Sequence, residues 1–194
     1  MTKTALLVLD MINEVIHENG KFAGMGMPAQ VKERNVLANT SAAITKARAK
    51  GIPVIFVRVG FSADYRECPE GSPLLGAAKE YGAPQLNDWA TEIHEDIDQR
   101  PEDFQVTKHR VSAFHGTSLD LILKRIGADT LLMGGVATDL VVQTTARDAH
   151  DKDFKVVILE DCCAAGSAET HDNVIAMLGA IGRVETSTSA KELN

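Results

Sequence analysis

The sequence predicts an α/β domain built around a mostly parallel sheet of about six strands. Short apolar runs rich in β-branched residues recur along the chain, and segments with helical composition or spacing lie between them. A continuous apolar run of this length suits a strand that is buried on both faces, as in a parallel sheet. Right-handed crossovers between such strands place helices on both faces of the sheet.

Six segments have the character of strands, four of them strongly apolar and two weaker. The strong runs are Ala5–Leu9, Pro53–Val59, Thr130–Val136 and Lys155–Leu159. The weaker ones are Gln105–Arg110 and Val184–Ser187.

The segments between the strands carry helix signals. Pro28–Lys50 is rich in Ala, Lys, Arg and Glu and is followed by Gly51, which matches the preference for Pro at a helix start and Gly just past its end. Thr117 or Ser118 can cap a helix that ends at Gly127 and has apolar residues at spacings of three and four. Two further helices are predicted at Thr138–Asp151 and Ala168–Ile181.

One long segment, Phe61–Arg100, lacks such periodicity and contains three prolines and three glycines. A long irregular insertion of this kind is often a lid or a binding loop. The chain shows no internal repeat, low-complexity tract or linker, and its length suits one domain at about 150 residues per domain. We therefore expect residues 1–194 to form a single domain.

Composition excludes several classes of protein. The chain has 27 acidic and 20 basic residues, a formal net charge of −7, which makes general binding to nucleic acid a poor hypothesis. Its three cysteines favour a reduced compartment over a disulfide framework. No segment resembles a signal peptide or a membrane-spanning helix. We expect a cytoplasmic protein without a membrane partner.

Polar and glycine-containing segments follow the predicted strands. In open α/β sheets, ligands bind beyond the carboxyl ends of the strands, so these residues are the first candidates for a site. They are Asp10, Arg58, Gly60, Lys108, the segment 135–138 and the segment 161–163.

Asp10 and Lys108 are the candidates for acid–base chemistry. Asp10 follows five apolar residues, and a partly buried carboxyl group can hold a proton near neutral pH. The alternatives are a helix-capping or ion-paired aspartate and a surface lysine. If the two side chains form a pair, the lysine should lower the pKa of the aspartate, an effect that bound substrate could reverse.

The segment 130–139 runs from a strand into a helix. The unpaired N–H groups at that helix start can bind an oxyanion, although a plain structural turn is the alternative. The chain has no dinucleotide fingerprint, no phosphate-binding P-loop and no GxSxG motif. Its histidines are dispersed, and Cys162 and Cys163 suit packing better than redox chemistry. We expect no cofactor and no metal.

These segments together resemble the isochorismatase-like (cysteine hydrolase) superfamily, in order and over nearly the whole chain. The first strand with Asp10 resembles the opening of that family. The segments that carry the rest of the resemblance are Lys108 with 112–117, the nucleophile strand and helix at 135–139 and 144–149, and the closing segments 160–165 and 169–171.

The resemblance implies a doubly wound α/β/α sandwich that assembles as a homodimer or a larger homo-oligomer. The family triad is Asp, Lys and Cys, and Asp10 and Lys108 match the first two. The Val136–Ala137 peptide falls where the family commonly has a cis bond. The oxyanion-binding amides would belong to Ala137 and to the residue at the nucleophile position.

The nucleophile position is the sharpest departure from the family, because this chain has Val141 where the cysteine should be. Valine cannot attack a carbonyl group, so a thioester mechanism loses its nucleophile. Ile12 replaces a frequent glutamine, and the Asp-x-His metal ligands of nicotinamidase-type members are missing after the second strand. The isochorismatases proper also lack the cysteine and hydrolyse a vinyl ether by protonating its double bond.

Our leading hypothesis is therefore a hydrolase that acts on a small anionic molecule through Asp10 and Lys108, without a cysteine nucleophile. The alternatives are a non-catalytic binding or scaffold member of the family and an amidase that uses Cys162 or Cys163. Because Val141 is bulkier than glycine, we expect poor turnover of isochorismate. Candidate carboxylate partners are Arg58, Arg66 and Arg110, and candidate pocket walls are Phe61, Phe114 and Trp89, with surface or packing roles as the alternatives.

Overall fold

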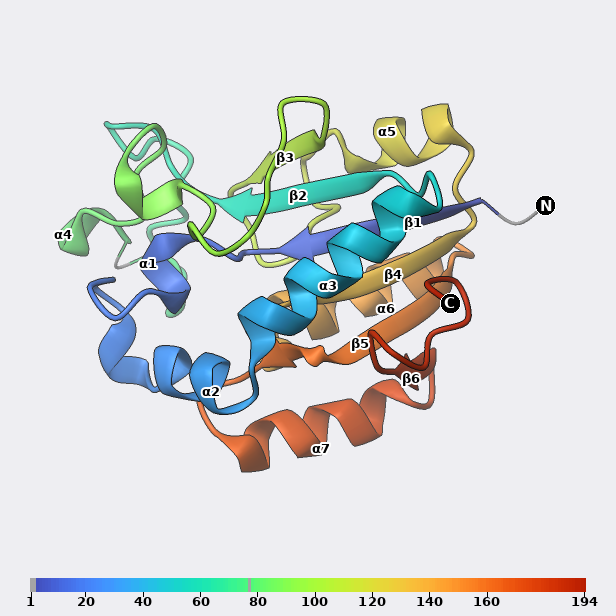
Figure 1. Cartoon of the computed structure of the whole chain (residues 1–194). Coiled ribbons are helices and arrows are strands. Elements are labelled where there is room, and N and C mark those ends of the chain that lie inside the picture. Colours follow the sequence, from blue (N-terminus) through green and yellow to red (C-terminus); the bar gives the residue numbers. More distant parts are fainter. Residues whose placement is uncertain (1–2, 77) are drawn as a thin grey trace.

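A six-stranded parallel sheet forms the centre of the structure, a computed structural model that describes residues 3–76 and 78–194. The strand order is β3-β2-β1-β4-β5-β6, and every neighbouring pair is parallel. Figure 1 shows the strands lying side by side. Their bounds are β1 Thr4–Leu9, β2 Val54–Val59, β3 Phe104–Lys108, β4 Thr130–Val136, β5 Lys155–Ala164 and β6 Arg183–Glu185.

Helices cover both faces of this sheet, which gives the doubly wound α/β/α sandwich (Figure 1). The α-helices are α1 Asn13–Ile16, α2 Met27–Glu33, α3 Val36–Ala49, α4 Ala78–Tyr81, α5 Leu119–Ile126, α6 Gln143–Asp151 and α7 Ala168–Leu178. Three short turns of helix are η1 Ala23–Met25, η2 Trp89–Thr91 and the π-helical turn η3 Thr138–Val142.

Alternate residues of each strand feed two separate apolar cores. In β1, Leu6 and Val8 pack with residues of α2 and α3, whereas Leu7 and Leu9 pack with residues of α5, α6 and α7. This alternation follows from the pleat of the strand, which points successive side chains to opposite faces. Both faces of the sheet are therefore buried against helices, as the continuous apolar runs of the sequence predict.

The predicted helix at Pro28–Lys50 is instead two helices, α2 and α3. The break falls at Asn35, whose φ of 54° lies in the left-handed region that asparagine tolerates better than most residues. Arg34 beside it is turned toward β5, where its guanidinium donates to the carbonyl of Cys163 and the carboxylate of Glu160. The composition of the segment favours a helix throughout, and this tertiary contact accompanies the interruption.

Several other predicted ends differ from the structure. Thr138–Asp151 begins with the π-helical turn η3 before α6, and α7 ends at Leu178. β5 runs to Ala164 rather than Leu159, with a register shift against β4 between Met133 and Gly135. The polar residues inside β5 hide this extension from a search for apolar runs.

The long segment Phe61–Arg100 is mostly irregular, as predicted, and its described residues, 61–76 and 78–100, include the short turns α4 and η2. It lies at the end of the sheet toward which β1 and β2 point (Figure 1). Part of it has a small apolar core of its own, formed by Phe61, Tyr65, Cys68 and Ala78. No helix in the described part of the chain is long and apolar enough to cross a membrane.

Candidate active site

Asp10 and Lys108 form a buried ion pair at the carboxyl edge of the sheet. Asp10 directly follows β1, Lys108 is the last residue of β3, and β2 lies between these strands. The Lys108 Nζ lies 2.8 Å from the Asp10 Oδ2. Because Asp10 is 5% exposed and Lys108 2%, the two charges are held almost entirely out of water.

Backbone groups complete the coordination of the pair. The Asp10 Oδ1 accepts a hydrogen bond from the N–H of Val59 at 2.8 Å. The Lys108 Nζ donates to the carbonyl of Arg110 at 3.0 Å. Asp10 itself has a φ of 51°, a left-handed conformation that aspartate adopts more readily than most residues. The carboxylate and the ammonium are therefore fixed in position by the ends of three adjacent strands.

Burial raises the pKa of Asp10 above its usual range, and Lys108 and the Val59 amide only partly offset this effect. The lysine lowers this pKa as expected, but the loss of water raises it by more. Removing water penalises the charged carboxylate strongly in an interior position. The net direction suits a carboxyl group that carries and delivers a proton.

Strand pleating decides which candidates share a face with the pair. Lys108 stands two residues after Val106, which belongs to the core on the α5–α6–α7 face, so Lys108 points to the same face. Val141 packs in that core as well. Arg58 follows Val57 of the same core by one residue and therefore points to the opposite face, with its Nε 3.5 Å from the Thr107 hydroxyl. The structure does not bring Arg58 to the pair.

The turn from β4 into η3 carries the predicted oxyanion amides. The Val136–Ala137 peptide is cis. The carbonyl of Ala137 accepts hydrogen bonds from the N–H groups of Leu140 and Val142, so those two amides are committed within the turn. Neither of these bonds uses the N–H of Ala137 or Val141. The Val141 side chain is 2% exposed and packs in the apolar core.

Two of the three predicted aromatic walls pack into apolar clusters. Phe61 is fully buried, and its ring stacks on His109, next to Lys108, at 5.9 Å between centroids. Phe114 stacks on Phe154, which precedes β5 and therefore lies at the amino edge of the sheet. The contact of Phe114 with Phe154 thus places its ring toward the edge opposite Asp10.

The remaining side chains proposed for the substrate have other partners. Arg66 pairs with the carboxylate of Asp64 on the exposed surface. Arg110 donates to the carbonyls of Glu67 and His109. Trp89 is 41% exposed and packs edge-on against a histidine of the segment after α1. These contacts give each of the three a structural role.

The cysteines after the predicted end of β5 lie within the strand and face opposite cores. Cys162 is 1% exposed and packs toward α3, whereas Cys163 is fully buried toward α7. Burial raises the pKa of Cys163 to about 12 and also raises that of Cys162 well above its usual range. Only the thiolate is a strong nucleophile, so neither sulfur is suited to attack a substrate at neutral pH.

Native protein treated with iodoacetamide at neutral pH should carry no adduct at Cys162 or Cys163, because both thiols are buried and protonated. In urea, both should be alkylated rapidly. Peptide mass spectrometry of the two samples measures this directly. Fast native labelling of either residue would instead restore support for an amidase that uses a cysteine of β5.

His171 belongs to the closing segment of the resemblance without an assigned role there, and it is a buried polar residue that contacts the start of η3. Its Nδ1 lies 2.9 Å from the hydroxyl of Thr138, the first residue of η3. Burial and the charge of Arg34 lower the pKa of His171, which keeps the ring neutral. A signal was present in the sequence, because His171, Val174 and Leu178 recur at spacings of three and four and so share the buried face of α7.

Two surface hollows are described, and neither is lined by Asp10 or Lys108. The larger, about 730 Å³, lies at the amino edge of the sheet around Lys3, Lys50 and Lys191. The smaller, about 390 Å³, includes Arg34 and Glu160 among its lining residues. Within residues 3–76 and 78–194, no group of three or more histidine, cysteine, aspartate or glutamate side chains is arranged to hold a metal ion.

A parallel α/β sheet carries a buried Asp–Lys pair at its carboxyl edge, the edge at which β4 also turns into η3. Comparison with known proteins gives the family. The model of the isochorismatase domain matches residues 4–190. The chain belongs to the isochorismatase family.

Two curated relatives illustrate the range of this family. The isochorismatase family protein YecD of Escherichia coli O157:H7 is 36% identical over 172 residues, covering 89% of this chain and 85% of YecD. The ureidoacrylate amidohydrolase RutB of Pantoea ananatis is 31% identical over 198 residues, covering 95% and 76% of the two chains.

Solved structures agree with the fold. An isochorismatase family protein from Desulfovibrio vulgaris superposes with a TM-score of 0.85 at 25% identity, covering 97% of this chain and 96% of the other. N-carbamoylsarcosine amidase from Thermoplasma acidophilum superposes with a TM-score of 0.78 at 29% identity, covering 98% and 99%. The relatives named for an activity are hydrolases, and this chain is assigned to the same class.

Proposed function

We propose that this protein hydrolyses a small anionic molecule by acid–base chemistry of Asp10 and Lys108, without a cysteine nucleophile. The observation that carries the proposal is the 2.8 Å contact between the two buried side chains. Burial raises the pKa of Asp10, which supports a carboxyl group that holds a proton for delivery. Lys108 supplies a positive charge where an anionic substrate needs one.

The chemistry that such a pair supports is hydrolysis of a vinyl ether or a similarly proton-activated bond. Asp10 gives its proton to the carbon–carbon double bond, and the substrate becomes an oxocarbenium ion. Water adds to that cation, and the adduct collapses to an alcohol and a ketone. The proton released from the water returns to the Asp10 carboxylate, so the enzyme is restored without a covalent intermediate.

The amides of Ala137 and Val141 are the proposed donors to negative charge on the substrate. Ala137 directly precedes η3 and Val141 is its fourth residue, and η3 follows β4 on the same edge of the sheet as the pair. Oriented N–H groups at a helix start favour an anion. This arrangement binds an anion locally, although the chain carries a formal charge of −7.

A panel of candidate substrates tests the proposal. Purified protein would be assayed by product-resolving chromatography with isochorismate, ureidoacrylate, N-carbamoylsarcosine and nicotinamide. The last three are suggested by the named activities of relatives and structural neighbours. We expect poor turnover of isochorismate. We also expect that ureidoacrylate, N-carbamoylsarcosine and nicotinamide form no thioester with the protein. Efficient isochorismate hydrolysis that is lost in Asp10→Ala would refute the expected pocket restriction.

A specific observation favours a second candidate, a binding or scaffold member of the family without catalysis. The Val141 side chain is buried in the apolar core at the position where the family resemblance places the nucleophilic cysteine. Crystals soaked with small carboxylates and amides separate the two functions. Density beside Val141 from a compound that the protein never turns over would favour the binding module.

Val141→Gly should increase turnover of isochorismate relative to the wild type, because we expect the valine side chain to narrow the substrate pocket. We expect a cost of about 3 kcal/mol in the free energy of unfolding, from the lost apolar burial and the added glycine in a helical turn. Val142→Gly is the matched control, since Val142 is fully buried in the same core and the same turn. Equal turnover of isochorismate by the two variants would show that the Val141 side chain does not restrict access of this substrate.

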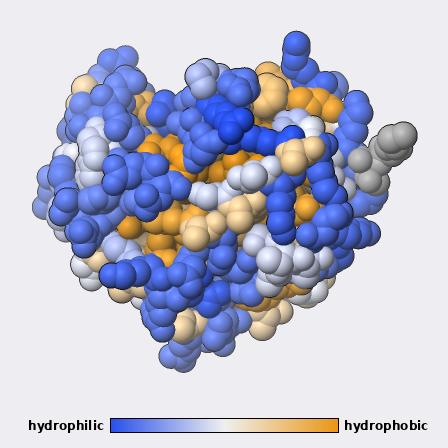
Figure 2. All heavy atoms as spheres, viewed as in Figure 1, coloured by the Kyte–Doolittle hydropathy of each residue, from blue (hydrophilic) through white to orange (hydrophobic). Residues whose placement is uncertain are grey.

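The assembly and location of the protein remain proposals. We expect a homodimer or a larger homo-oligomer in the cytoplasm, without nucleic-acid or membrane partners. Apolar residues show between hydrophilic ones on the face in Figure 2, and Met25 and Leu121 are among the exposed large apolar side chains of the molecule. Light scattering coupled to gel filtration measures the mass of the assembly in solution.

A further inference from the structure

A chain of polar contacts, buried at its Thr138–His171 end and partly exposed at Glu160 and Arg34, leads away from the turn that carries the proposed oxyanion amides. The Thr138 hydroxyl contacts the His171 Nδ1 at 2.9 Å, and the His171 Nε2 lies 3.7 Å from the Glu160 Oε2. Glu160 in turn accepts from the Arg34 guanidinium at 2.7 Å. Thr138 is fully buried and His171 is 1% exposed, so solvent cannot replace the contact between them.

The position of the His171 ring is set by the capped start of α7. The Ser167 hydroxyl accepts a hydrogen bond from the N–H of Thr170, and the carbonyl of Ser167 accepts from the N–H of His171. A capped first turn of helix is more rigid than an uncapped one because its N–H groups are satisfied. The backbone of His171, and with it the start of its side chain, is therefore held in a fixed position relative to α7.

The charges around the ring decide which nitrogen accepts. A carboxylate at 3.7 Å favours the proton on Nε2, and Glu160 is itself held by Arg34. With the proton on Nε2, the Nδ1 of a neutral ring is an acceptor. The Thr138 hydroxyl then donates to Nδ1, which fixes the rotamer of the first residue of η3.

Thr138 directly follows Ala137 and is the first residue of η3, which ends at Val142. The carbonyl of Ala137 already closes this turn by accepting from Leu140 and Val142. The hydroxyl of Thr138 adds a side-chain tether from the turn to α7. A displaced turn would move the N–H groups of Ala137 and Val141 together.

We infer that His171 is a positioning residue that, through the Thr138 hydroxyl, holds the turn bearing the Ala137 and Val141 amides at the active site. This inference rests on the proposed function for the catalytic importance of those amides. The tether itself, the hydrogen bond between Thr138 and His171, is independent of the proposed function and can be tested structurally.

Three substitutions test the tether. His171→Leu removes the acceptor, Thr138→Val removes the donor with little change of shape, and His171→Asn keeps an acceptor near the position of Nδ1. In nuclear magnetic resonance spectra, the amide signals of Ala137 and Val141 should shift in the first two variants and return toward wild type in the third. With a substrate from the panel, kcat should fall about 10- to 100-fold in the first two variants, as expected for a misplaced group, and recover in His171→Asn.

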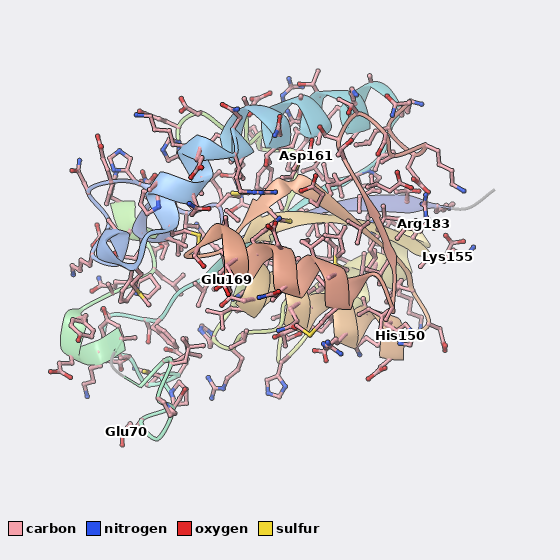
Figure 3. All side chains as sticks on the ribbon, turned by 90° about the horizontal axis from the view of Figure 1, so that it is seen from below. Glu70, His150, Lys155, Asp161, Glu169 and Arg183 are labelled. Carbon is pink, nitrogen blue, oxygen red and sulfur yellow. The ribbon has the colours of Figure 1, made fainter. Side chains whose placement is uncertain are left out.

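His150→Leu is the matched control, because His150 is exposed near the end of α6. In Figure 3 it lies at the lower right, well separated from Glu169 in the first turn of α7. Amide signals of Ala137 and Val141 that move no more in Thr138→Val and His171→Leu than in this control would overturn the tether. If His171→Leu fails to fold, Thr138→Val and His171→Asn still decide the question. Shifted amide signals with no measurable hydrolysis by any variant or the wild type would contradict the proposed function and leave the tether supported.

Discussion

Lys108→Met should lower the free energy of unfolding by about 3–5 kcal/mol at neutral pH, because it leaves the Asp10 carboxylate buried without its partner. Chemical denaturation monitored by circular dichroism measures the loss. The exposed Lys124 of α5 provides the control, and Lys124→Met should change stability by no more than about 0.5 kcal/mol.

The destabilisation by Lys108→Met should depend on pH with a definite sign. Without the lysine, the folded-state pKa of Asp10 rises further above its unfolded value. A carboxyl group with a raised folded pKa adds stability when protonated and loses that contribution as the pH rises through the folded pKa. The cost of Lys108→Met should therefore be largest at alkaline pH and shrink toward acid pH. A pH-independent cost would mean that lost packing, and not the buried charge, dominates.

The double variant Asp10→Asn with Lys108→Met completes the cycle. It leaves no buried charge at either position, so it should be more stable than the sum of the two single losses predicts. Strict additivity would show that the two side chains are not energetically coupled, despite their 2.8 Å contact.

Asp10→Asn should reduce kcat by about 100- to 10,000-fold on any substrate that the protein hydrolyses, which is the range for loss of a positioned proton donor. Asparagine fills nearly the same volume but cannot deliver a proton. The wild-type rate should fall as the pH rises through the raised pKa of Asp10, since only the protonated carboxyl is an acid. Steady-state kinetics across pH measures both effects.

Asp120→Asn is the matched control for this experiment. Asp120 is a half-exposed aspartate in the first turn of α5, where it pairs with Lys152. Its rate and pH profile should equal those of the wild type. Substantial activity in Asp10→Asn would mean that another group delivers the proton, and it would refute the proposed mechanism.

The absence of a cysteine at position 141 directs both the function and its tests. Cys162 and Cys163 do not substitute for it, because burial holds both thiols protonated within β5. A hydrolase of this family that lacks the thiolate must activate its substrate or water in another way. Our proposal assigns this task to the Asp10–Lys108 pair.

Much of the fold was predictable because its signals are local. The bounds of β4, Thr130–Val136, follow directly from one apolar run. The end of α5 follows from Gly127, whose φ of 67° is a left-handed conformation that glycine adopts freely. Asn35 shows where such signals fail, since the composition around it favours one helix and the structure has two.

The chemistry-bearing ends of the strands were also predictable, but their partners were not. Parallel topology alone places Asp10 and Lys108 at one edge of a sheet. The aromatic candidates are different, because nothing local indicates that the Phe114 ring packs against Phe154 at the other edge. A residue in a loop can turn its side chain toward either end of the domain, and packing alone decides the direction.

The α/β class, the approximate positions of the strands and the two ionisable residues at their ends can be read from the amino-acid sequence. These follow from periodicity, capping and chain direction, all of which act over a few residues. The tertiary structure alone decided that Asp10 and Lys108 touch, that burial outweighs the lysine in setting the pKa of Asp10, and that His171 reaches Thr138. Those outcomes depend on how much water remains around groups far apart in the chain, and only the packed structure sets that quantity.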